Sequence, residues 1–250
     1  GETVIIRGGN FGPLGTSVGA TYGVVTQNNN AEEITMEEDN NREADFTAEY
    51  HAEACSVTGT GHNEITCTSV PGVGRPLFWT VQVDGQNSTV PTTSYARPSL
   101  INVTDQYGQP LENLKTEGND IILLRGGNFG RVGSNTDIHS VTYGVDGTSY
   151  TAVDCTVLSN TPSSLESVMQ CRTAPGVGTS LRFVIDVGGQ KSILSSANDA
   201  LTTLSYAAPT IIHIDPQFAL TSNTKEVTIT GTNFGPPGTL VGVSFGYSHA

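Results

Sequence analysis

One short stretch of the chain has the residue spacing of a catalytic motif. Residues 15–19 read Gly-Thr-Ser-Val-Gly, the GxSxG pattern that exposes a nucleophilic serine in many hydrolases. Residues 238–242 have the same glycine spacing but carry leucine in place of Ser17, and no strand-turn-helix pattern surrounds that serine. We therefore expect a structural turn here, no catalytic residue, no enzymatic activity and no cofactor.

Four cysteines could form covalent links or bind a metal, and they occur as two closely spaced pairs, Cys55 with Cys67 and Cys155 with Cys171. A turn between two such residues can place them on adjacent strands, and closing a loop of this size stabilises a fold by roughly 3 kcal/mol. Buried free thiols are the alternative. The absence of a CxxC pattern from the sequence argues against zinc, so we expect no metal site. Two disulfides predict an oxidising, extracellular compartment.

Asparagine side chains at two positions could carry glycans, because Asn87 and Asn102 each begin an Asn-x-Ser/Thr sequon. Asn102 sits between Ile101 and Val103, so strand alternation directs its side chain away from the core. Asn87 follows a glycine-containing turn. We expect both side chains to be exposed and glycosylated in a eukaryotic protein.

Charge limits the partners that this chain can bind. The sequence has 24 acidic and 11 basic residues, with a net charge of -13 at pH 7, and its arginines are scattered. Nucleic acid binding needs concentrated cations, so we expect no nucleic acid partner. No apolar run is long enough to span a bilayer, and we expect no membrane insertion in this segment. The expected partners are copies of the chain or neighbouring domains, packed end to end, with covalent glycans and cell-surface proteins as further candidates.

An internal repeat organises the chain. An Asn-Phe-Gly motif follows a short apolar run three times, within residues 9–12, 127–130 and 232–235. The repeat unit is about 110 residues long, a length that suits one β-sandwich. Stacked copies favour a structural or binding role over a single active site.

The repeat predicts the domain boundaries. We expect a first domain over residues 1–97 that lacks its first strand, a complete domain over 98–208, and the N-terminal part of a third over 209–250. On this phasing both ends fall inside a domain. They are interpreted as a window on a longer chain, while completion by neighbouring chains stays an alternative.

An acidic insert over residues 29–45 distinguishes the first domain from the second. We expect an acidic loop followed by an extended strand, although the apolar spacing after the loop also fits a helix. The carboxylates could hold calcium, but they lack the spacing of an EF-hand loop, so a solvated loop is favoured.

Apolar residues alternate with polar ones in both complete repeats. The alternating positions are Leu77, Trp79, Val81 and Val83 in the first repeat and Leu181, Phe183, Ile185 and Val187 in the second. A period of two predicts strands with one buried face, and frequent Gly, Pro and Asn predict turns between them. The expected fold class is all-β, with tandem immunoglobulin-like sandwiches.

The order of motifs resembles a known domain family. Pro209, Ile211, Ile214 and Pro216 have the spacing Pro-x-Ile-x-x-Ile-x-Pro, and residues 227–235 read Val-Thr-Ile-Thr-Gly-Thr-Asn-Phe-Gly. Together with a cysteine pair, Thr-x-Pro-Gly and a closing Val-x-Val-x-Gly-Gln, this order resembles the IPT/TIG domains of plexins and some transcription factors. The resemblance implies an immunoglobulin-like sandwich and leaves the function open among DNA binding, receptors and extracellular arrays.

The acidic charge and the paired cysteines disfavour DNA binding, and they fit both an extracellular array and a receptor ectodomain. We expect a non-enzymatic extracellular structural glycoprotein, whose tandem domains form a rod in the shaft of a surface or secreted filament. The ectodomain of a cell-surface adhesion or receptor protein is the alternative. An accessory segment of a carbohydrate-active enzyme would have the same features, and a DNA-binding domain fits the acidic charge poorly.

Overall fold

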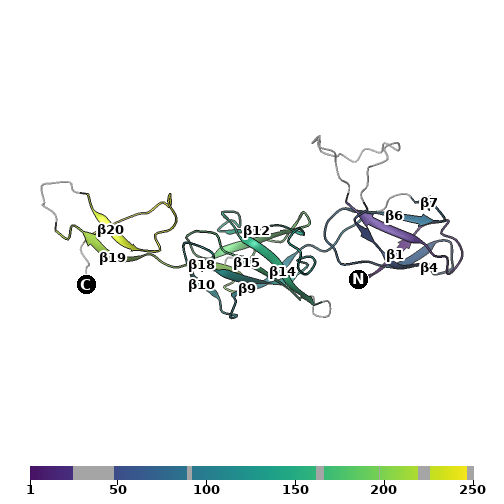
Figure 1. The fold of residues 1–250 in the computed structure, drawn as a ribbon, viewed down its shortest axis with the longest axis horizontal. Coiled ribbons are helices and arrows are strands. Elements are labelled where there is room, and N and C mark those ends of the chain that lie inside the picture. Colours follow the sequence, from purple (N-terminus) through teal and green to yellow (C-terminus); the bar gives the residue numbers. More distant parts are fainter. Residues whose placement is uncertain (25–47, 89–91, 162–165, 197, 219–225, 247–250) are drawn as a thin grey trace, which may run out of the picture. The chain divides into compact units, whose positions relative to one another are not determined.

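The computed structural model describes residues 1–24, 48–88, 92–161, 166–196, 198–218 and 226–246, and every regular element in these ranges is a β-strand (Figure 1). The acidic insert lies outside the described residues. The chain divides into two compact units: unit 1 comprises Gly1–Arg97 with Val187–Gln190, and unit 2 comprises Pro98–Asp186 with Lys191–Ala250. The expected all-β fold class is confirmed.

Two sheets form unit 1. The first has the strand order β1-β5-β4, with β1 at Thr3–Arg7, β5 at Glu64–Thr68 and β4 at Glu53–Val57. The second has the order β3-β2-β6-β7, with β8 also paired to β6; the strands are β3 (Tyr50–His51), β2 (Gly19–Gly23), β6 (Leu77–Val83), β7 (Gln86–Asn87) and β8 (Thr92–Thr93).

The core of unit 1 lies between these sheets. Val57 and Ile65 enter it from the first sheet, and Tyr22 and Trp79 from the second, where their rings stack 4.2 Å apart. The alternation in β6 is the reason this face is buried, because every second residue of a strand points to the same side. The predicted period of two is confirmed in this strand.

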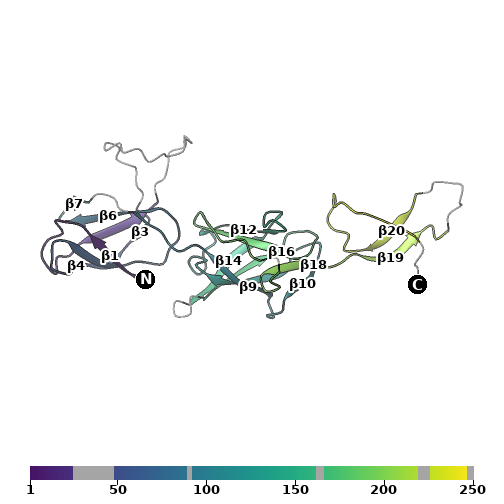
Figure 2. The ribbon, with the colours of Figure 1, turned by 180° about the vertical axis from the view of Figure 1, so that it is seen from behind.

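The sandwich of unit 2 also consists of two sheets, and each contains one strand more than its counterpart in unit 1 (Figure 2). One sheet has the order β14-β15-β11-β9, with strands β14 (Val153–Thr161), β15 (Glu166–Arg172), β11 (Ile121–Gly127) and β9 (Ser99–Asp105). The other has the order β10-β18-β16-β12-β13, with β17 also paired to β16; its strands are β10 (Leu111–Leu114), β18 (Thr203–Tyr206), β16 (Leu181–Val187), β12 (Ile138–Gly144), β13 (Tyr150–Thr151) and β17 (Gln190–Lys191).

A two-stranded sheet follows in the third repeat. Strand β19 (Thr210–Asp215) pairs antiparallel with β20 (Thr228–Thr232). All six residues of β19 are exposed, including Ile211, Ile212 and Ile214. A row of exposed isoleucines on a strand is a surface that commonly pairs or packs with another element.

Each Asn-Phe-Gly motif forms the same left-handed loop. The asparagines Asn10, Asn128 and Asn233 have φ angles of 64°, 61° and 62°, and the glycine that ends each motif also has a positive φ. Asparagine and glycine tolerate this backbone region better than other residues. In the two sandwiches the phenylalanine folds inward, and Phe129 is fully buried.

Candidate functional site

The serine of the GxSxG stretch does not stand at a nucleophile elbow. Ser17 forms a bridge with Ser56, and strand β2 follows it where a hydrolase would have a helix. Thr16 beside it donates from both its backbone N–H and its hydroxyl to Pro13 O. The described residues contain no group of three or more His, Cys, Asp or Glu side chains that could hold a metal.

Disulfides staple one sheet in each unit. Cys55 joins Cys67 across β4 and β5, and Cys155 joins Cys171 across β14 and β15, with Cα–Cα distances of 4.1 and 4.2 Å. A break in strand register lies beside the first cysteine of each pair. At these β-bulges the preceding residues, Ala54 and Asp154, adopt φ angles of 51° and 52°. A β-bulge and a disulfide therefore occur side by side in both units.

Two tyrosines close a ring of hydrogen bonds with a loop in unit 2. The Ala174 N–H donates to the Tyr143 hydroxyl at 2.8 Å, and the Tyr206 hydroxyl donates to the Ala174 carbonyl at 2.5 Å. The two hydroxyls lie 2.7 Å apart, and the hydrogen bond between them completes the ring. The two tyrosines stand on β12 and β18, and together they fix the loop that follows β15.

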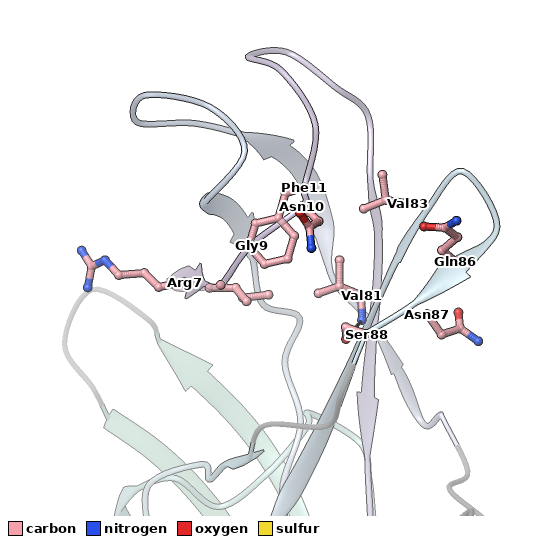
Figure 3. Close-up of a pocket in the computed structure, with 11 residues that line it drawn as sticks. Arg7, Gly9, Asn10, Phe11, Val81, Val83, Gln86, Asn87 and Ser88 are labelled. Atoms are coloured by element: carbon pink, nitrogen blue, oxygen red, sulfur yellow. Dashed lines mark hydrogen bonds between the residues drawn. The ribbon is translucent and has the colours of Figure 1, made fainter.

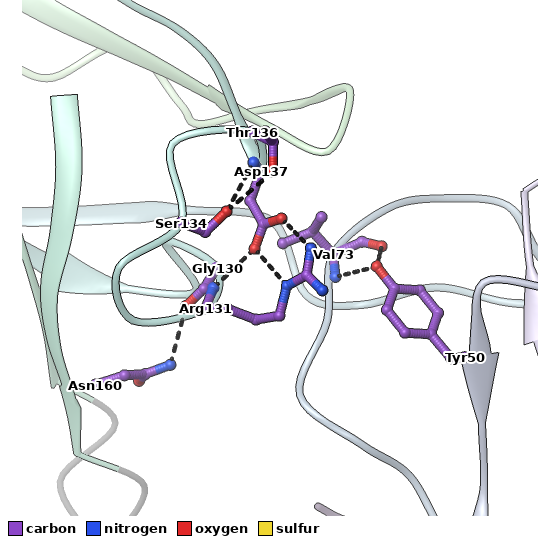
Figure 4. Close-up of polar contacts among 8 residues, drawn as sticks. All are labelled: Tyr50, Val73, Gly130, Arg131, Ser134, Thr136, Asp137 and Asn160. Carbon is purple, nitrogen blue, oxygen red and sulfur yellow. Dashed lines mark hydrogen bonds and ion pairs between the residues drawn. The ribbon is translucent and has the colours of Figure 1, made fainter. Parts of the chain in front are cut away.

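Unit 1 contains the same ring. The Val70 N–H donates to Tyr22 at 2.9 Å, the Tyr22 and Tyr95 hydroxyls lie 2.9 Å apart, and Tyr95 donates to the Val70 carbonyl at 2.5 Å. A further tyrosine, Tyr50, accepts from Val73 N and donates to Val73 O in the same loop (Figure 4).

Tyr150 makes the equivalent two hydrogen bonds to Val177 in unit 2. Each Pro-Gly loop is thus held by three tyrosines. We name these two sets the tyrosine clamps: Tyr22, Tyr50 and Tyr95 in unit 1, and Tyr143, Tyr150 and Tyr206 in unit 2.

Burial keeps the clamp hydroxyls protonated. Desolvation is the main cause that raises the pKa of Tyr95 and of Tyr206 far above the usual value, and the hydrogen bond to the partner tyrosine adds to it. Desolvation also raises the pKa of Tyr143. A neutral hydroxyl can donate to the loop carbonyl, so the arrangement is structural and does not supply a base near neutral pH.

An ion pair between the buried Asp137 and the half-exposed Arg131 follows the Asn-Phe-Gly loop of unit 2 (Figure 4). Asp137 accepts from Arg131 through Nη2 at 2.6 Å, Nε at 3.1 Å and the backbone N–H at 2.9 Å. Desolvation alone would raise the pKa of Asp137, but the bonds from Arg131 and from Ser134 outweigh it and lower that pKa. In the other two repeats a threonine, Thr16 or Thr239, packs at the equivalent glycine.

The two sequon asparagines differ in environment. Asn87 lies on β7 and is exposed, as expected. Asn102 lies on β9 opposite Arg125, where its side chain is half-buried and its Oδ1 is enclosed without a hydrogen-bond partner. The expectation of an exposed side chain is wrong for Asn102, because the side chain is half-buried in a sheet where β9 pairs with β11. Glycosylation at Asn87 and Asn102 stays a prediction.

Unit 1 has an open groove of about 370 Å³ beside β1 (Figure 3). We name it the β1 groove. Its lining is of mixed polarity: apolar side chains come from Ile6, Phe11, Val81 and Val83, and polar ones from Arg7, Asn10, Gln86, Asn87 and Ser88. Arg7 also forms an exposed ion pair with Glu64, 3.4 Å away. The residue types that line the groove do not provide a catalytic pair.

Sequence reasoning missed the tyrosine clamps and the β1 groove. The clamps had a signal, because Tyr22 and Tyr143 stand at equivalent repeat positions, as do Tyr95 and Tyr206. Neither pair interrupts the apolar pattern, so each looked like ordinary core. The groove itself was not predicted, although the first domain was expected to lack its first strand.

Comparisons with known proteins add one distant similarity. No family model matches the chain, and no curated protein is similar to it. Among solved structures, the adhesin FdeC of Escherichia coli is similar at 14% sequence identity with a TM-score of 0.22, over 72% of this chain and 53% of the adhesin chain. This chain therefore spans about half the length of that adhesin. At this TM-score the similarity carries no argument about function.

The sheets themselves define the class of protein. This is an all-β chain whose tandem units are β-sandwiches, each with an internal disulfide and a tyrosine clamp. Within the described ranges, no helix is long and apolar enough to cross a bilayer.

Proposed function

We propose that this chain is a non-enzymatic extracellular structural glycoprotein, whose tandem immunoglobulin-like domains of the IPT/TIG type build the shaft of a surface or secreted filament. The observation that carries the proposal is the repetition of one stabilising plan. Units 1 and 2 each contain a disulfide across adjacent strands and a closed tyrosine ring on the following loop. Stability devices repeated along a chain suit a load-bearing array.

The extracellular part of the proposal rests on the cysteines. All four cysteines of the chain are used in the two disulfides, and such bonds persist in oxidising compartments. The exposed Asn87 supports glycosylation, since a glycan needs a solvent-facing asparagine. The net charge of -13 supports a surface on which side-by-side association is disfavoured.

A cell-surface adhesion or receptor ectodomain is the second candidate, and the β1 groove favours it. Concave surfaces that combine apolar and polar side chains, as the β1 groove does, are typical of binding sites. Cell-surface proteins would be the partners on this alternative. Both candidates share the compartment and the fold and differ in whether the protein assembles into fibres.

Electron microscopy of the native material separates the two candidates. Periodic fibres that an antibody against the chain decorates along their length would support the filament, and isolated particles on cell membranes would support the ectodomain. Non-reducing peptide mapping tests the compartment, because free thiols at Cys55 and Cys155 in native protein would overturn the extracellular assignment. Glycosidase treatment that leaves the mass unchanged would remove Asn87 and Asn102 from the proposal.

A further inference from the structure

The two sulfurs of each disulfide differ in their access to solvent. Cys67 and Cys171 are buried in the cores of their units, where they are 1% and 0% exposed. Their partners, Cys55 and Cys155, are only partly buried. Because the same asymmetry occurs in both units, it belongs to the fold of the domain.

Strand position explains this asymmetry. Cys67 and Cys171 lie on β5 and β15, and each of these strands is paired on both sides within its sheet. Cys55 and Cys155 lie on β4 and β14, which stand at the end of the same two sheets. A terminal strand has a sheet neighbour on one side only, so its side chains keep part of their contact with solvent.

The β-bulge opens the approach to the partly buried sulfur. The strand register shifts beside Cys155, and Asp154 immediately before it is exposed. Unit 1 has the same arrangement, with an exposed Ala54 before Cys55. A small molecule in solvent can therefore approach the first sulfur of each pair without displacing the core.

This access determines which sulfur an external thiol can attack. In thiol–disulfide exchange a thiolate forms a new S–S bond with one sulfur and expels the other sulfur as a thiolate. The core encloses Cys171, so an external thiol does not reach that sulfur while unit 2 is folded. Attack at Cys155 remains open, and it makes Cys171 the leaving thiolate.

The buried leaving sulfur makes the exchange slow and reversible in the folded chain. Cys171 lies opposite Ile122, and Met169 on the same strand is also fully buried, so the expelled thiolate carries its charge among apolar side chains. Burying an unpaired charge is costly. The expelled sulfur also stays beside the mixed disulfide, where it can attack Cys155, restore the native bond and release the external thiol.

We propose that Cys55 and Cys155 are the thiol-exchange sites of this chain, at which a small external thiol such as glutathione forms a mixed disulfide. Cys67 and Cys171 are the resolving cysteines, which close each native bond from the core side. This reactivity follows from strand order and burial and does not depend on the compartment, so it goes beyond the proposed function.

Single cysteine variants of the full chain test the difference in access. Cys171→Ala leaves a free thiol at Cys155, and Cys155→Ala leaves one at Cys171. With glutathione disulfide near neutral pH, the Cys155 thiol should form its mixed disulfide at least about a hundredfold faster, because the Cys171 thiol reacts only after the core opens. Cys67→Ala and Cys55→Ala are the corresponding pair in unit 1. Mass spectrometry measures the gain of one glutathione over time.

The denatured chain is the control for the role of the fold. In guanidinium chloride the two variants of each pair should react at similar rates, because neither thiol is then enclosed. Circular dichroism checks that both variants keep their strands without denaturant. Equal rates in the folded variants, or a rate difference that persists in guanidinium chloride, would overturn the proposal.

The native chain gives a second measurement that needs no substitution. Reduced glutathione is added in excess, the reaction is quenched with acid, and the remaining thiols are alkylated before peptide mapping. Glutathione should be found on Cys55 and Cys155, and the alkyl label on Cys67 and Cys171. Glutathione spread evenly over both cysteines of a pair, or absent from Cys55 and Cys155, would contradict the proposal. Both experiments use the purified chain, so the extracellular assignment can fail without changing either result.

Discussion

The hydroxyls of Tyr143 and Tyr206 lie 2.7 Å apart inside unit 2, although the two residues are far apart in the sequence. Both also bond to Ala174, so two strands and a loop meet at one ring of hydrogen bonds. The same ring in unit 1 joins Tyr22, Tyr95 and Val70. Repetition in both units identifies the tyrosine clamp as part of the domain design.

Removing one hydroxyl from the clamp should destabilise its unit. We expect Tyr206→Phe to lower the free energy of unfolding by about 1–3 kcal/mol, because the Ala174 carbonyl and the Tyr143 hydroxyl lose their partner in a buried place. Urea denaturation followed by fluorescence would measure this. Tyr107→Phe, on an exposed side chain, is the matched control and should change stability by less than about 0.5 kcal/mol. Equal stability of the two variants would contradict a structural role for the ring.

The clamps should make stability fall in alkaline solution. Folding raises the pKa of Tyr95 and of Tyr206. As the pH rises, these hydroxyls therefore lose their protons at lower pH in the unfolded chain than in the folded one. The clamp contribution is fully present below about pH 10, the ordinary tyrosine pKa, and is lost above it at up to about 1.4 kcal/mol per pH unit for each tyrosine.

Rapid denaturant unfolding between neutral pH and pH 11 would measure this slope before the disulfides degrade. The double variant Tyr95→Phe with Tyr206→Phe should show a shallower decline than the parent chain. A parallel decline in the two proteins would assign the alkaline loss to other groups.

Losing a disulfide should weaken one unit and leave the other intact. The double variant Cys155→Ala with Cys171→Ala opens a loop of 16 residues, which is expected to cost roughly 3 kcal/mol. Differential scanning calorimetry should then show one transition at lower temperature. The variant Cys55→Ala with Cys67→Ala should move the other transition, and a single common shift in both variants would mean that the units unfold together.

Neutralising Asp137 should destabilise unit 2 by about 1.5–3 kcal/mol, because the charged acceptor of the Arg131 hydrogen bonds is lost. Glu112→Gln, an exposed change of the same charge, is the control for Asp137→Asn. The lowered pKa of Asp137 means that its contribution is present above the ordinary carboxyl value and is lost as the pH falls through the folded-state pKa. In an acid titration, the free energies of unfolding of the parent chain and of Asp137→Asn should therefore converge at low pH.

The sequence predicted the parts of the fold that local spacing determines. Alternation in β6 and β16 identified strands with one buried face, since burial of every second residue leaves a direct mark on residue types. The left-handed loops are also determined locally, because Asn128 and Gly130 are residue types that tolerate positive φ. Each of these features depends on a few neighbouring residues.

The features that sequence analysis missed depend on distant segments. The clamp joins Tyr143 to Tyr206, and Asn102 is half-buried in a sheet where β9 pairs with β11. Pairing between strands that are remote in sequence is not encoded in the spacing of either strand alone. The β1 groove is the clearest case, since β1 and β11 have similar sequences and differ in what lies beside them.

The parallel pairing of β10 with β18 determines how unit 2 responds to tension. β10 lies early and β18 late in this sandwich, and they run side by side with Leu111 opposite Leu204 and Leu114 opposite Tyr206. A force that pulls the ends of this unit apart slides these two strands lengthwise past each other. Their hydrogen bonds are then loaded together in shear, so they cannot open one at a time, and rupture of the domain requires them to fail at once.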